Sequence, residues 1–265
     1  MFKYYNLNFM LIFAKMKIRH FLSEFWKGGI SVLRIPMNEV ITTNKAERKQ
    51  LDAKEKEQLE LFQKMMRMDL PNVQIPEIKP TVPLDLYPMS QKKSEYAHLP
   101  YGKVSDIADA GCGPLALEYA FRANGMKVNF PKLIKEVVDK GYRAYIYDDD
   151  GNIVDGSGTE YALFDNLGIR LFSVYDILEC LDAGDCVCIL IQNSVYHQDA
   201  KRKGNHFVTL IGIDEEKNAI MMDGNLIVDE HPEAALVRKP FMEMALGIRS
   251  AWGWDKKKLK TFIRR

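Results

Sequence analysis

Five prolines fall between residues 71 and 88, and they divide this chain of 265 residues into two parts. Proline lacks the backbone N–H, fixes φ and disfavours the helical conformation of the residue before it, so no regular helix or central strand can run through this stretch. We therefore expect residues 71–88 to form an extended linker that stands apart from the folded core. The predicted domains are a helical N-terminal extension that includes this linker, residues 1–84, and a folded domain, residues 85–265.

The beginning of the chain is basic and amphipathic. Residues 1–36 carry six Lys or Arg residues against the single acid Glu24, and apolar residues recur there at helical spacing. This pattern is typical of a helix that lies on a membrane surface. Two other interpretations stay open: a helix that packs on the core, and sequence upstream of a later translation start at Met16 or Met37.

The composition excludes several classes of protein. Lys and Arg number 37 against 36 Asp and Glu, so there is no global positive field to attract nucleic acid, and we expect no nucleic-acid partner. The longest apolar run, residues 9–14, is far shorter than the roughly 20 residues of a transmembrane helix. Four cysteines are too few for a secreted scaffold held by disulfides. We expect a globular protein of the cytoplasm.

The spacing of apolar residues and chain breakers predicts short, well-separated elements. Helices are expected over residues 44–70, 113–124, 131–140 and 174–181. Strands are expected over residues 186–192, 206–213 and 219–223, with a hairpin over 145–154 that turns at Asp150-Gly151-Asn152. Because helices come first and an antiparallel sheet follows, the predicted fold class is α+β.

Cys112 stands between Gly111 and Gly113, at the start of the predicted 113–124 helix. A thiol at this place faces unpaired N–H groups and the positive end of the helix dipole, which both favour the thiolate. The thiolate is the nucleophilic form, and flanking glycines let a substrate backbone approach closely. The other interpretation is a small apolar residue that packs at a helix start.

His206 and Asp223 are the candidate partners of this thiol. His206 opens an apolar strand, where an imidazole is costly unless it has a polar partner, and Asp223 ends the next strand. A hairpin between the two strands would bring the carboxylate beside the imidazole, where it could hold one tautomer and favour the imidazolium. The alternatives are a satisfied core histidine and a turn aspartate before Gly224.

Several short motifs occur in an order that resembles a known family. They are Gln91, Tyr96, Tyr101-Gly102, Gly111-Cys112-Gly113-Pro114, Gly158-Thr159, Gly204-x-His206-Phe207-Val208 and Asp223. The series resembles the bacterial papain-like cysteine peptidases of the C39-like group, which are related to the domains that trim double-glycine leader peptides from bacteriocins. The resemblance covers about residues 85–250. It implies a papain-like fold, with the nucleophile helix packed on an antiparallel sheet.

The resemblance also implies a role for each site residue. Cys112 would be the nucleophile, His206 the general base and acid, and Asp223 the orienting group. A glutamine upstream of the cysteine usually supplies an oxyanion donor, and Gln91 is the best match. The chain departs from the pattern at Asp106, six residues before Cys112, where many papain-like enzymes hold that glutamine. It also has Gly224 after Asp223, where relatives tend to have proline.

Other candidate sites are weaker. Cys180, Cys186, Cys188 and His197 could be combined into a zinc site, but a Cys-x-Cys pair in an apolar run is more simply core. Residues 148–152 resemble a calcium loop superficially, but the glycine stands at the wrong offset, which favours a hairpin tip. We expect no metal and no organic cofactor.

The leading functional hypothesis is a thiol hydrolase that cleaves peptide bonds in a peptide or protein substrate through an acyl-enzyme. An enzyme that passes the same thioester to an amine, an acyltransferase or transpeptidase, is an alternative. A catalytically idle papain-like module that only binds its partner is a second alternative, because function depends on the site rather than on the fold.

Overall fold

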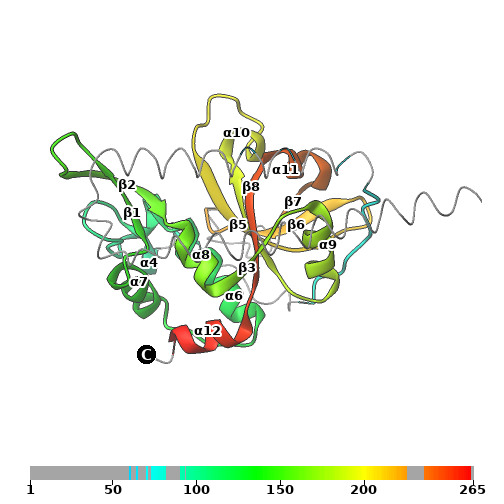
Figure 1. Ribbon diagram of the computed structural model, residues 1–265, viewed down its shortest axis with the longest axis horizontal. Helices are drawn as coiled ribbons and strands as arrows, with labels where there is room; N and C mark the ends of the chain where they lie inside the picture. Colours follow the sequence, from blue (N-terminus) through cyan, green and yellow to red (C-terminus); the bar gives the residue numbers. More distant parts are fainter. Residues whose placement is uncertain are drawn as a thin grey trace, which may run out of the picture. The chain divides into compact units, whose positions relative to one another are not determined.

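The computed structural model describes residues 60, 64, 70, 73–81, 90–92, 94–225 and 236–263. The basic segment 1–36 and most of the predicted helix 44–70 lie outside the described residues. The described part is an α+β structure in which helices pack on an antiparallel sheet, as the sequence predicts (Figure 1). Among its helices, none is both long and apolar enough to cross a membrane.

The main sheet has six strands in the spatial order β3-β8-β4-β5-β6-β7, and every neighbouring pair is antiparallel. The strands are β3 Gly168–Leu171, β4 Val187–Gln192, β5 Asn205–Ile213, β6 Asn218–Met222, β7 Leu236–Pro240 and β8 Ile248–Trp254. The central strands β4 and β5 are almost entirely buried, because helices cover both faces of the sheet.

The helices lie in two layers (Figure 1). On one face are α6 Cys112–Ala123, α7 Phe130–Asp139, α8 Tyr161–Leu167 and α12 Lys256–Ile263, and on the other are α9 Val174–Asp182 and α11 Phe241–Gly247. Two short helices, α4 Ser94–Ala97 and α5 Ile107–Ala110, precede α6, and α10 Asn193–Tyr196 lies between β4 and β5.

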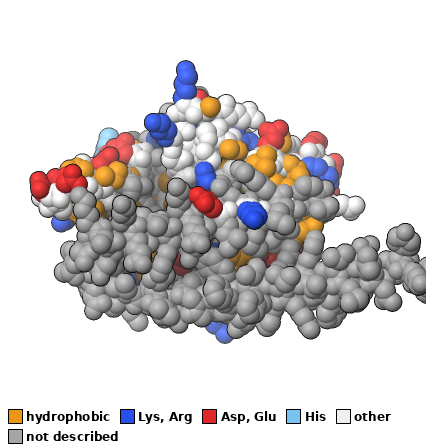
Figure 2. All heavy atoms as spheres, turned by 45° about the horizontal axis from the view of Figure 1, so that its top comes forward, with side chains coloured by type: hydrophobic (Ala, Val, Ile, Leu, Met, Phe, Trp, Pro, Cys, Tyr) orange, Lys and Arg blue, Asp and Glu red, His pale blue; other side chains and the backbone are white. Residues whose placement is uncertain are grey.

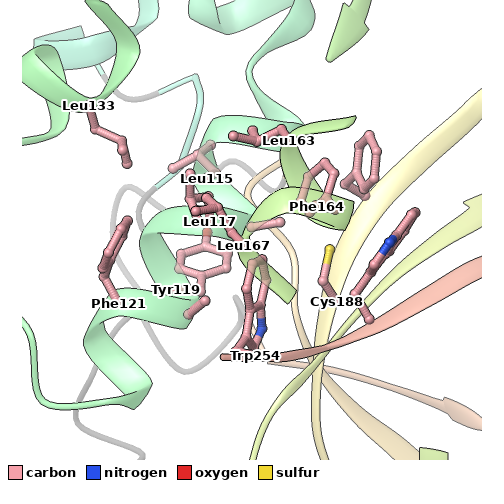
Figure 3. Close-up of a cluster of buried hydrophobic side chains, with 14 of the residues drawn as sticks. Leu115, Leu117, Tyr119, Phe121, Leu133, Leu163, Phe164, Leu167, Cys188 and Trp254 are labelled. Atoms are coloured by element: carbon pink, nitrogen blue, oxygen red, sulfur yellow. The ribbon is translucent and has the colours of Figure 1, made fainter. Parts of the chain in front are cut away.

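Each face of the sheet has its own hydrophobic cluster. Along β5, Phe207 belongs to the cluster beneath α6, whereas Val208 and Leu210 belong to the cluster beneath α9 and α11, as the two-residue period of a strand requires. Figure 3 shows leucine and aromatic side chains of α6 and α8 meeting Cys188 and Trp254 of the sheet. The site described below lies at the end of β5 where these two layers meet.

A separate two-stranded hairpin pairs β1 Arg143–Tyr147 with β2 Ile153–Thr159. At its tip, the Asp148 carboxylate accepts hydrogen bonds from the backbone N–H groups of Asp150 and Asn152. Acidic side chains gather at this end of the domain in Figure 2, and Asp148, Asp149 and Asp150 are all exposed. The predicted hairpin is therefore confirmed, and it extends beyond the predicted range at both ends, from residue 143 to residue 159.

The expectation that residues 71–88 stand apart from the core is wrong for the described part of that stretch. Residues 73–81 are extended, but Ile78 exchanges two backbone hydrogen bonds of 2.8 Å with Ile213 of β5. The Ile78 side chain is buried in the cluster beneath α9 and α11. A proline cannot donate to a strand, but Ile78 can, and pairing at a sheet end needs one such residue. The boundary between residues 84 and 85 lies outside the described residues.

Other predicted elements agree with the structure more closely. The helices expected at 113–124, 131–140 and 174–181 correspond to α6, α7 and α9, and the three expected strands correspond to β4, β5 and β6. The expected order, helices first and then the sheet, is wrong, because α8, α9, α10 and α11 are interleaved with the strands and α12 follows the last of them. The sequence patterns did not reveal β3, β7 and β8.

Candidate active site

Cys112 is the first residue of α6, and packing within the chain explains both glycines beside it. A Cβ on Gly111 would lie 2.5 Å from the Ile107 carbonyl oxygen, and one on Gly113 would overlap the Thr159 side chain. The glycines therefore let α5 and β2 close around the start of the helix, in addition to any room that they leave for a substrate. As a whole residue, Cys112 is half-buried.

The β5–β6 hairpin brings His206 and Asp223 together. Thr209 pairs with Met222, so Asp223, one residue further on, lies on the same sheet face as Val208 and His206. The Nε2 atom of His206 lies 2.7 Å from Oδ1 of Asp223. The imidazole also makes a side-chain hydrogen bond with the Cys112 thiol, and because Nε2 faces Asp223, the nitrogen toward the sulfur is Nδ1. The structure thus unites the three predicted residues.

The charge state of this chain of hydrogen bonds follows from its surroundings. Burial opposes a charged thiolate, but hydrogen bonds with His206 and with the Phe207 backbone N–H outweigh it and lower the pKa of Cys112. Burial likewise opposes the imidazolium, and the hydrogen bonds to Asp223 and Cys112 overcome it and raise the pKa of His206. The arrangement therefore favours a thiolate–imidazolium pair, which can attack a carbonyl carbon and then deliver a proton.

The other three cysteines have the opposite character. Burial raises the pKa of Cys180 and of Cys186 to about 12, and it raises the pKa of Cys188 well above its usual range. Cys186 and Cys188 belong to the hydrophobic core, which confirms that interpretation of the Cys-x-Cys pair. Within the described part of the chain, no group of three or more His, Cys, Asp or Glu side chains is arranged to hold a metal ion.

Asp223 has two further partners that the sequence did not reveal. Its Oδ2 atom accepts a hydrogen bond of 2.6 Å from the Tyr196 hydroxyl, and its Oδ1 atom accepts a second one, of 2.8 Å, from the Asn225 backbone N–H. Burial raises the pKa of Asp223, but the hydrogen bonds from His206 and Tyr196 outweigh it and hold that pKa below its ordinary value. Tyr196 lies in α10, a helix of four residues that is too short to show a periodic pattern of apolar residues, so the sequence did not indicate it.

Gln91 lies next to this network without joining it. Its backbone N–H donates to the Gly224 carbonyl, and its side-chain Nε2 donates to the Ala108 carbonyl over 2.8 Å. Nε2 also lies 3.5 Å from Oδ1 of Asn225, and the buried Oε1 has no hydrogen-bond partner among the described residues. Because the Ala108 oxygen requires a donor, Nε2 rather than Oε1 is the amide atom that faces it. Within the described part of the chain, the hydrogen bonds of Gln91 go to neither Cys112 nor His206.

Asp106, the alternative oxyanion position, has a structural role instead. It is the N-cap of α5, and its carboxylate accepts a hydrogen bond of 3.1 Å from the Asp109 backbone N–H. A carboxylate is an acceptor and would repel an oxyanion, so this residue is unsuited to the donor function.

The chain matches no family model, and no curated protein matches its sequence. Among solved structures, it is similar to a crystal structure of a protein from Bacillus anthracis that is provisionally named a C39-like peptidase. The two are 18% identical, with a TM-score of 0.39, over 68% of this chain and 97% of the other. A TM-score this low does not establish a shared fold, so the interpretation of the site depends on its own geometry.

Proposed function

We propose that this chain is a cysteine peptidase in which Cys112 is the nucleophile, His206 the general base and acid, and Asp223 the group that orients the imidazole. The observation that carries the proposal is the continuous chain of hydrogen bonds from the Cys112 thiol through His206 to the Asp223 carboxylate. A papain-like arrangement of the domain, with a peptide or protein as substrate, belongs to the same proposal.

The proposed reaction has two steps. In the first, the Cys112 sulfur forms a bond to the carbonyl carbon of the scissile peptide, and His206 gives its proton to the leaving amine as the C–N bond breaks. In the second, His206 removes a proton from water, the resulting hydroxide attacks the thioester, and the acid is released with the Cys112 thiolate restored. Asp223 keeps Nε2 of His206 protonated throughout, so Nδ1 is the nitrogen that exchanges protons.

The oxyanion formed in each step needs hydrogen-bond donors. The backbone N–H of Cys112, at the start of α6, has the orientation of a helix N-terminus, which favours negative charge. We keep Gln91 as the proposed second donor. To act in this way, its Nε2 would turn from the Ala108 carbonyl toward the substrate oxygen.

A peptide-library digest analysed by mass spectrometry tests the proposal. The wild-type protein should release new peptide termini, and Cys112→Ala and His206→Ala should release none, while both keep the wild-type circular dichroism spectrum. Cys180→Ala is the matched control, because it removes the thiol of another half-buried cysteine outside the site and should leave cleavage unchanged.

The same digest separates the alternative reactions. Hydrolysis adds the mass of water to the acyl fragment, whereas acyl transfer adds the mass of the accepting amine. Cleavage that persists in Cys112→Ala would refute the proposed nucleophile. Binding of peptides by wild type and Cys112→Ala, without turnover by either, would favour the idle binding module.

A further inference from the structure

We propose that Tyr196 is a positioning residue of this site, which acts through the Asp223 carboxylate to hold His206 in its working orientation. The inference rests on the proposed function, because it assigns a fourth member to the Cys112–His206–Asp223 chain. Tyr196 touches none of the reacting atoms in the proposed reaction, so we do not count it among the catalytic residues.

The Asp223 carboxylate is fully enclosed by donors. Oδ1 accepts hydrogen bonds from Nε2 of His206 at 2.7 Å and from the Asn225 N–H at 2.8 Å. Oδ2 accepts one from the Tyr196 hydroxyl at 2.6 Å. Asp223 is 1% exposed and Tyr196 is 2% exposed, so water cannot readily replace the hydroxyl. The Tyr196 hydroxyl is thus the group that holds Oδ2 of the carboxylate.

This arrangement gives the hydroxyl a mechanical role. The torsion that rotates an aspartate carboxylate has broad minima, so a carboxylate held at one oxygen can turn. Donors on both oxygens fix its plane, and a fixed plane keeps Oδ1 directed at Nε2 of His206. Burial and the neighbouring Asp223 charge raise the pKa of Tyr196, so the phenol keeps its proton and always donates.

The fold holds Tyr196 in place independently of Asp223. Tyr196 ends α10, the four-residue helix between β4 and β5, and its ring packs in the cluster beneath α9 and α11. The ring lies 5.6 Å from the His206 ring, centroid to centroid, and Lys239 of β7 places Nζ 5.0 Å above it. Other titratable groups near this network are Cys112 of α6, His197, which follows Tyr196, and Tyr119 of α6, which lies near Asp223 and Tyr196.

A purely structural role for Tyr196 would give a different experimental result from a positioning role. If the hydroxyl only stabilised the β4–β5 connection, removing it would lower kcat/KM by the same factor whether or not residue 223 carried a charge. If the hydroxyl acts through the carboxylate, its removal should hardly lower kcat/KM once the charge of residue 223 is removed. A double-mutant cycle between residues 196 and 223 separates the two cases.

The experiment compares wild type, Tyr196→Phe, Asp223→Asn and the double variant. We expect Tyr196→Phe to lower kcat/KM for a cleaved peptide about 10-fold or more in the wild-type background, since a hydrogen bond to a buried charge is lost. In the Asp223→Asn background the same change should lower it less than about 2-fold, because no charge remains to be directed. Equal losses in the two backgrounds would overturn the proposal.

A second readout does not require turnover. The pKa of His206, measured by NMR, should fall in Tyr196→Phe, because the carboxylate no longer stays aligned with Nε2; an unchanged or raised value would overturn the proposal. Tyr101→Phe is the matched control, because it removes a buried hydroxyl with a 2.7 Å bond to Thr159, and it should leave this pKa in place. A protein that cleaves nothing but shows the shift would refute the proposed function and retain the Tyr196 contact.

Discussion

Gly113, in the first turn of α6, lies directly against Thr159, the last residue of β2. A Cβ on Gly113 would overlap the Thr159 Oγ1, Cβ and Cγ2 atoms. The Thr159 hydroxyl in turn bonds the buried Tyr101 hydroxyl at 2.7 Å. The hairpin is therefore fitted to the residue that follows Cys112, and any side chain at position 113 must displace it.

Gly113→Ala should lower the free energy of unfolding by about 1–3 kcal/mol, the usual cost of overpacking a buried contact. Urea denaturation measures this change. The same substitution in a Thr159→Gly background should cost less, because the three overlapping atoms are absent. A Gly113→Ala cost that is the same in both backgrounds would show that the contact with Thr159 is not the cause.

Ile78→Ala should destabilise the domain by about 2–5 kcal/mol, the range for truncation of a buried aliphatic side chain. Ile78 is 5% exposed and pairs with Ile213, although it lies among the prolines. Ile169→Ala on the edge strand β3 is the control, since Ile169 is 61% exposed and should change stability little. Similar urea midpoints for the two variants would mean that the segment 73–81 is not part of the folded unit.

Arg143→Lys should destabilise the domain by about 1–3 kcal/mol although it keeps the charge, because a lysine cannot reproduce the guanidinium fork. The buried Arg143 donates to the carbonyls of Tyr101, Ala144 and Gly158 and to the Ser105 hydroxyl. The control is Arg238→Lys, whose side chain is half exposed and pairs only loosely with Asp214. Equal decreases in the thermal unfolding temperature of the two variants would show that the hydrogen bonds of the Arg143 guanidinium do not stabilise the domain.

The stability of the domain should depend on pH at both ends of the range. The pKa of Asp223 is lowered on folding, so its contribution is present above the unfolded value of about 3.9 and is lost as the pH falls through the folded value. The pKa of His206 is raised, so its contribution is complete below about 6.5 and is lost as the pH rises through the folded value.

Asp223→Asn should flatten both limbs of this profile, because it removes one ionising group and the main charged partner of the other. Urea midpoints between pH 3 and pH 10 measure the effect. His98→Gln is the control, since the His98 side chain is 88% exposed and should leave the profile unchanged. Parallel curves for wild type and Asp223→Asn would contradict the assigned pKa directions.

The pairing of His206 with Asp223 could be predicted because it depends on local patterns. The two apolar strands and the polar turn between them fix a hairpin, and the two-residue period then places both side chains on one face. The helix that starts at Cys112 is equally local, since Pro114 suits its first turn and Gly125, with φ of 69°, ends it.

The parts that the sequence did not reveal depend on long-range contacts. Strand β8 lies at the centre of one half of the sheet, but Arg249, Ser250 and Gly253 interrupt its apolar pattern. The proposed role of Tyr196 depends on its contact with Asp223, which lies 27 residues away in sequence. The pairing of Ile78 could not be predicted from the density of prolines around it. Prolines prevent a regular element over the whole segment, but the pairing of Ile78 needs only its own N–H and carbonyl group.

The rate of alkylation of each cysteine at pH 6 tests the central claim most directly. Iodoacetamide reacts with thiolates, and the pKa of Cys112 is lowered while those of the other three are raised. Peptide mapping should find Cys112 modified about 100-fold faster than the partly exposed Cys180, and His206→Ala should remove most of that difference. Modification of Cys180 as fast as Cys112, or a Cys112 rate unchanged in His206→Ala, would contradict the proposed thiolate–imidazolium pair.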